Sequence, residues 1–121
     1  MKQLIKKQEL DLLKISQEEL IEKFKTQLVK DFEMSDVLNH LDPITDFNYE
    51  SIHHHIAKAL KTIDAKDFSR YQHLLYRIDI SEKQLNAELK AQPEGEHYSI
   101  LADLIIKRIL QKIILKIQYS K

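Results

Sequence analysis

Two copies of the pattern Glu-x-x-His are the residues of this sequence best spaced for chemistry. They are Glu50 with His53 and Glu94 with His97. On a helix, residues three positions apart lie on one face, so each pair could present a carboxylate and an imidazole to the same ion. Both groups are ligands of iron, manganese and zinc. The pattern therefore raises metal binding as one hypothesis.

The order of these pairs along the chain resembles that of the ferritin-like helical bundles. In that family two Glu-x-x-His pairs and two further glutamates hold a di-iron or di-manganese centre. The further glutamates would here be Glu19 or Glu22, and Glu82 or Glu88. The resemblance covers only these scattered residues, and it implies a small metal-binding bundle as an alternative function.

The local sequence favours a structural role for the same residues. Glu50 lies away from the apolar face of its segment, whereas a metal ligand in a bundle core must point inward. Glu94 lies between Pro93 and Gly95, before a helix can be regular. The side chains of His53–His55 diverge by about 100° per residue on a helix and cannot share one ion. We therefore expect no metal site and no cofactor.

Other catalytic chemistry lacks its usual residues. The chain has no cysteine, which excludes a thiol nucleophile and a sulfur-ligated metal site. It has a single glycine, which excludes a glycine-rich phosphate-binding loop. Asp103 and His97 could form an acid and base pair, but no nucleophile or oxyanion site is indicated beside them. We expect no catalytic residues and a non-enzymatic protein.

The elements that must position these residues are predicted to be helices. Tight β-hairpin turns usually contain glycine, and this chain has one glycine in 121 residues, so a sheet is not expected. Ser16 and Ser81 each begin a capping-box pattern, with Glu or Gln three residues later, which marks a helix start. Asn48 and Asp64 are expected to be the N-caps of the helices that follow each of them.

Apolar residues recur with the helical period along most of the chain. The predicted helices cover residues 17–33, 49–63, 65–78, a short stretch after Ser81, and 96–119, preceded by an N-terminal stripe of Leu4, Ile5, Leu12 and Ile15. In the range 65–78 the apolar face consists of Phe68, Tyr71, Leu74, Leu75 and Ile78. Pro43 and Pro93 interrupt the pattern. The sequence predicts an all-α, compact single domain over residues 1–121, a bundle of five or six helices with a long apolar C-terminal helix.

The C-terminal helix has the strongest apolar pattern, and its apolar stripe changes sides near Ile105. Its two halves must therefore pack against different neighbours. The later stripe contains Ile106, Ile109, Leu110, Ile113 and Ile117. Leaving such side chains in water costs about 1.5–3 kcal/mol each, so something must cover them. The cover is either the chain's own N-terminal stripe or a protein partner, and we take these five residues as candidate interaction residues.

Charge is balanced overall but divided along the chain. Residues 1–8 and 104–121 contain lysine and arginine without any acid, while residues 31–50 contain six acids without lysine or arginine. The basic ends can neutralise the acidic middle from within, or they can bind nucleic acid or an anionic surface. Nucleic-acid binding is the less expected of these, because Tyr119 is the only aromatic residue in the basic half of the last helix.

These observations lead to one main hypothesis and two alternatives. No apolar run approaches the roughly 20 residues of a membrane-spanning helix, and Leu4-Ile5 is too short for the core of a signal peptide, so we expect a cytoplasmic location. The main hypothesis is a non-enzymatic protein-association module that binds a protein partner or itself, as in a homodimer. The alternatives are the metal-binding bundle and the binder of nucleic acid or anionic surfaces.

Overall fold

The structure is a computed structural model that describes residues 7–31 and 49–119. Within these ranges it contains six helices and no strand, which confirms the all-α prediction. The helices are α1 (Lys7–Leu13), α2 (Gln17–Asp31), α4 (Tyr49–Lys66), α5 (Phe68–Ile78), α6 (Glu82–Ala91) and α7 (His97–Tyr119). The predictions made for Leu4, Ile5, Phe32, Glu33, Pro43 and Asn48 lie outside the described residues.

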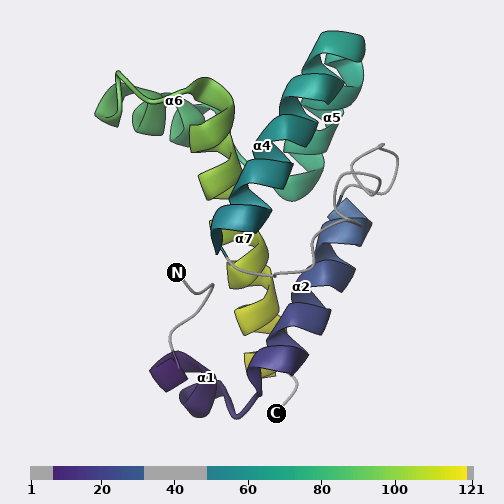
Figure 1. The fold of residues 1–121 in the computed structure, drawn as a ribbon, viewed down its shortest axis with the longest axis vertical. Coiled ribbons are helices and arrows are strands. Elements are labelled where there is room, and N and C mark those ends of the chain that lie inside the picture. The colour runs from purple at the N-terminus through teal and green to yellow at the C-terminus, as the bar shows by residue number, and fades with distance from the viewer. Residues whose placement is uncertain (1–6, 32–48, 120–121) are drawn as a thin grey trace.

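Helix α7 is the central element of the described structure (Figure 1). It contacts α1, α2, α4, α5 and α6, and α4 and α5 lie side by side near its N-terminal half. Leu101 and Ile105 are fully buried in its first half, and Ile106 and Ile109 in its second half. Both parts of the apolar stripe are therefore covered. No helix among the described residues combines the length and the apolar character that a bilayer span requires.

The helix starts follow the predicted caps at two positions and depart from them at a third. The hydroxyl oxygens of Ser16 and Ser81 accept hydrogen bonds from backbone N–H groups three residues on, at 3.1 and 3.0 Å. The prediction of Asp64 as an N-cap was wrong, because α4 continues through Lys66. Asp67 caps α5 instead, and its Oδ1 accepts from the N–H of Arg70 at 3.1 Å.

The predicted break before α2 is confirmed by the backbone. Helix α1 ends at Leu13, and Lys14 has a left-handed conformation with φ of 60°. The N–H groups of Lys14 and Ile15 donate to the carbonyls of Asp11 and Leu10, which closes the end of α1. The predicted apolar stripe was wrong at Leu12, which is 79% exposed.

Leu12 is exposed because the turn at Lys14 gives α1 its own direction. In this orientation Leu10 is buried in the core and Leu13 is packed against it. These two residues lie three positions apart and share a face, whereas Leu12 lies on another.

Candidate functional site

The five candidate interaction residues lie on the inner side of the chain. Ile106, Ile109, Ile113 and Ile117 are buried, and Leu110 is partly buried. They belong to the same core cluster as Leu20, Phe24 and Leu28 of α2. One copy of the chain thus covers this stripe with its own helices. Association with a partner through these residues stays a prediction.

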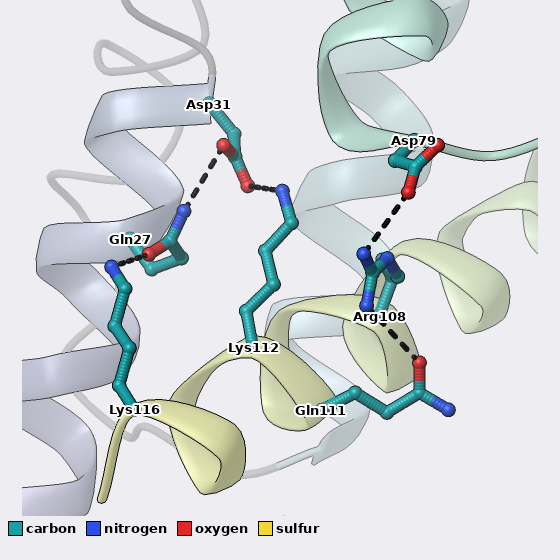
Figure 2. A network of polar contacts seen from close by, with 7 residues as sticks. All are labelled: Gln27, Asp31, Asp79, Arg108, Gln111, Lys112 and Lys116. Atoms are coloured by element: carbon teal, nitrogen blue, oxygen red, sulfur yellow. Dashed lines mark hydrogen bonds and ion pairs between the residues drawn. The ribbon is translucent and has the colours of Figure 1, made fainter. Parts of the chain in front are cut away.

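The basic side of α7 is engaged with α2 (Figure 2). The Nζ of Lys112 donates to Oδ2 of Asp31 at 3.1 Å, and the Nζ of Lys116 donates to Oε1 of Gln27 at 2.7 Å. Gln27 Nε2 in turn donates to Oδ1 of Asp31 at 3.1 Å. Asp31 and Gln27 are both buried. The pair of Lys112 and Asp31 neutralises one basic and one acidic group within the chain, and Lys116 has an uncharged acceptor in Gln27.

Arg108 extends the same pattern on the other side of α7. Its guanidinium donates to Oδ2 of Asp79 at 3.0 Å and, more weakly, to Oε1 of Gln111 at 3.5 Å (Figure 2). Lys107 is the further basic residue in the described part of the range 104–119. Arg108 and Lys112 have acidic partners inside the chain, while binding of a nucleic acid or an anionic surface stays an untested alternative.

The Glu-x-x-His residues take up separate positions. The Nε2 of His53 lies 2.8 Å from the backbone oxygen of Ser99 and 3.7 Å from Oδ1 of Asp103. The Nε2 of His97 lies 3.3 Å from the hydroxyl of Tyr71. Glu50 and Glu94 are exposed.

No group of three or more His, Asp or Glu residues close enough to hold a metal ion occurs among the described residues. The structure therefore leaves the metal-binding alternative without a ligand set in residues 7–31 and 49–119.

A groove of about 640 Å³ lies between α5 and α6, and His97 at the start of α7 also lines it. Its apolar lining comprises Phe68, Tyr71, Leu75, Tyr76, Ile80 and Leu85. Its polar lining comprises Asp64, Gln72, Ser81, Glu82, Asn86 and His97. We call this feature the α5–α6 groove. Its volume is within the range of about 300–1,000 Å³ that is typical of binding sites in proteins.

Two large aromatic side chains on the lining of the groove are exposed. Phe68 is 59% exposed and Tyr76 is 84% exposed. The prediction that Phe68 shares the buried face of α5 was wrong. Phe68 is the first residue of α5, and side chains in a helix lean toward its N-terminus, so the ring projects beyond the covered part of the helix. An aromatic residue outside the apolar arc, such as Tyr76, is the signal by which the sequence could have indicated this site.

A network of aromatic and polar side chains lies beside the groove, at the start of α7. The hydroxyl of Tyr98 donates to Oδ2 of Asp64 at 2.5 Å. The ring of Tyr71 stacks on that of Phe68 with centroids 6.2 Å apart, and it meets the ring of Tyr98 edge-on at 6.4 Å. With the contact between Tyr71 and His97, these residues join the ends of α4, α5 and α7.

The tyrosines of this network are held in the protonated form. Burial, with a smaller contribution from the charge of Asp64, raises the pKa of Tyr71 to about 12. The hydrogen bond to Asp64 raises the pKa of Tyr98. A phenol that keeps its proton is neither a base nor a nucleophile at neutral pH, but it is a hydrogen-bond donor and an apolar surface.

A second hollow of about 690 Å³ lies between the α1–α2 turn, α2 and the end of α7. Its apolar floor includes Leu13, Ile15, Ile113 and Ile117. Its rim carries side chains of both charges, four lysines and two glutamates. Because the charges are mixed, this hollow indicates no single class of ligand.

Comparison of the chain with protein-family models, curated proteins and solved structures finds no match. The functional interpretation therefore rests on the residues and the geometry described above.

Proposed function

We propose that this chain is a non-enzymatic helical module that associates with a protein partner by accommodating a segment of it in the α5–α6 groove. The observation that carries the proposal is the exposure of Phe68 and Tyr76 on the lining of a groove of about 640 Å³. Scattered single apolar residues are normal on a protein surface, whereas aromatic residues gathered at one hollow indicate an interaction site.

The dimensions of the groove fit the side chains of a protein segment. A helix or extended peptide inserts a few anchor side chains into such a groove, and its backbone stays outside. Leu75, Ile80 and Leu85 would contact the anchors, because they form the aliphatic part of the lining. Aromatic residues at such positions commonly carry a large share of the binding energy. Phe68 and Tyr76 are the residues to which we assign that role.

The partner can be another protein or a second copy of this chain. The structure supports self-association through the groove better than through the stripe of Ile106, Ile109, Ile113 and Ile117. The chain's own helices bury these four residues. A homodimer formed through the α5–α6 groove is consistent with the same proposal. The oligomeric state measured by light scattering separates the two kinds of partner.

Peptide selection against the purified chain tests the proposal directly. Helical peptides selected from a random library on the wild type should lose at least about tenfold in affinity, or about 1.4 kcal/mol, on Phe68→Ala and on Tyr76→Ala. Tyr119→Ala is the matched control, because Tyr119 is equally exposed (85%) and does not line the groove. Selected peptides that bind all three variants equally, or a library that yields no binder, would contradict the proposal.

A further inference from the structure

The charge of the α5–α6 groove bears on the chemistry of its occupant, given the proposed function. Two carboxylates, Asp64 and Glu82, line the groove, and neither lysine nor arginine does so. Lys66 and Lys83 lie close in sequence to these acids, but their side chains are not part of the lining. The groove lining thus carries two carboxylates and neither lysine nor arginine.

The two carboxylates differ in how much of their charge the helices offset. Glu82 lies in the first turn of α6, where the positive end of the helix dipole opposes its charge. Glu96 directly precedes α7, and its carboxylate accepts hydrogen bonds from the N–H groups of Tyr98 and Ser99, each at 3.1 Å. Asp64 lies in the last turn of α4, where the helix dipole is itself negative. Of the two lining carboxylates, Asp64 is therefore the one whose charge the helix dipole does not offset.

The surroundings of Asp64 suit an organic cation. One of its oxygens accepts from Tyr98, and a carboxylate has sites for further hydrogen bonds. The stacked rings of Phe68 and Tyr71 lie at the same end of the groove. Aromatic faces attract ammonium and guanidinium groups, and this attraction adds to that of a carboxylate. A lysine or arginine side chain finds both kinds of contact here.

We propose that the partner segment is cationic as well as apolar, and that one of its lysine or arginine side chains pairs with Asp64 against the exposed ring of Phe68. Its apolar side chains then occupy the rest of the groove, toward Leu85 and Tyr76. An acidic segment is disfavoured, because it would bring like charges to Asp64 and Glu82.

The test uses two synthetic helical peptides of leucine and lysine, or of leucine and glutamate, that are otherwise identical. The chain has no tryptophan, so one tryptophan in each peptide reports binding by fluorescence without background from the protein. We expect the lysine peptide to bind at least about tenfold more tightly than the glutamate peptide, and to lose affinity as salt is added. Phe68→Ala and Tyr76→Ala verify that binding occurs in the groove.

Two further variants locate the cation. Asp64→Asn keeps an acceptor for the hydroxyl of Tyr98 and removes the charge, so the lysine peptide should bind about tenfold more weakly. Glu82→Gln should have a smaller effect, because the start of α6 already offsets its charge. Glu94→Gln is the control, since it removes one negative charge from an exposed position outside the lining.

The outcomes separate this inference from the proposed function. If the glutamate peptide binds as tightly as the lysine peptide and both need Phe68 and Tyr76, the groove binds a partner but the inference is wrong. If the lysine peptide binds but Asp64→Asn and Glu94→Gln weaken it equally, the pairing with Asp64 is wrong. If neither peptide responds to Phe68→Ala or Tyr76→Ala, the proposed function and the inference are both contradicted.

Discussion

The two tyrosines of α5 show how position rather than residue type decides a role. Tyr71 and Tyr76 are five residues apart, so their side chains point about 140° apart on the helix. Tyr71 is buried beside His97, while Tyr76 is exposed on the groove. Periodicity alone predicted the buried position of Tyr71. It could not predict the bond between Tyr98 and Asp64, because these residues lie 34 positions apart and meet only in the folded chain.

The raised pKa of Tyr71 predicts a loss of stability at alkaline pH. Below about pH 10 its phenol is protonated in both the folded and the unfolded state. Between pH 10 and about 12 the unfolded state releases the proton and the folded state keeps it, so rising pH favours unfolding. The free energy of unfolding should fall by about 2–3 kcal/mol over this window from Tyr71 alone.

Urea titrations at a series of pH values measure this effect. Tyr71→Phe removes the phenol, so its stability should decline less steeply above pH 10 than that of the wild type. Tyr76→Phe is the control at an exposed position and should keep the wild-type slope. Identical slopes in all three proteins would show that Tyr71 does not retain its proton.

The left-handed backbone at Lys14 predicts a stabilising substitution. A residue with a Cβ costs roughly 1 kcal/mol at φ near 60°, and glycine does not. Lys14→Gly should therefore raise the free energy of unfolding by up to about 1 kcal/mol. Lys14→Ala removes the same charge without relieving the backbone, so it should not stabilise the chain. Denaturant unfolding of the wild type and both variants measures this effect. If Lys14→Gly is no more stable than Lys14→Ala, the φ angle at position 14 carries no strain.

Between elements, the junction of α2 and α7 depends on buried polar contacts. The sequence predicted that basic and acidic segments would neutralise each other within the chain, and the pair of Lys112 with Asp31 does so. The sequence could not specify the pairing, since the two residues lie 81 positions apart. Helix types and approximate limits follow from local periodicity and caps. Which helix faces meet depends on packing that no local pattern contains.

We predict that breaking the pair of Lys112 and Asp31 lowers the free energy of unfolding by a large amount. Only 6% of the Asp31 side chain and 18% of the Lys112 side chain are exposed, so Lys112→Met leaves a buried carboxylate without its cation. Breaking a fully buried ion pair costs about 3–5 kcal/mol of stability. Because the Lys112 side chain is still partly exposed, we expect a loss of about 2–3 kcal/mol here.

A double-mutant cycle checks this prediction. Asp31→Asn together with Lys112→Met removes both charges and should recover part of the stability that Lys112→Met loses. Lys107→Met is the control on the same helix, and it should change the free energy of unfolding by less than about 0.5 kcal/mol, because Lys107 is exposed. A double mutant less stable than Lys112→Met would contradict the electrostatic explanation.

At the scale of the molecule, α7 joins the described helices into one unit. Every other described helix contacts it, so each part of the core depends on the same element (Figure 1). The α5–α6 groove lies at the N-terminal end of α7, and the isoleucine stripe lies toward its C-terminal end. The strong apolar pattern of α7 thus indicated the centre of the fold, whereas the candidate site is formed by helices with weaker patterns around it.

This arrangement predicts that Ile113→Asp unfolds the chain rather than dissociating a dimer. Ile113 is 3% exposed and lies in the core that α2 and α7 share. A carboxylate without a partner costs several kcal/mol in an apolar core, against a total stability of about 5–15 kcal/mol for a domain of this size. Circular dichroism should show loss of helix at a temperature at which the wild type is folded. Leu115→Asp, two residues away and 45% exposed, should remain folded. If the wild type is instead a dimer and Ile113→Asp is a folded, helical monomer, the isoleucine stripe is the dimer interface. The chain would then fold without burying Ile113, and a second copy would cover this residue in the wild type.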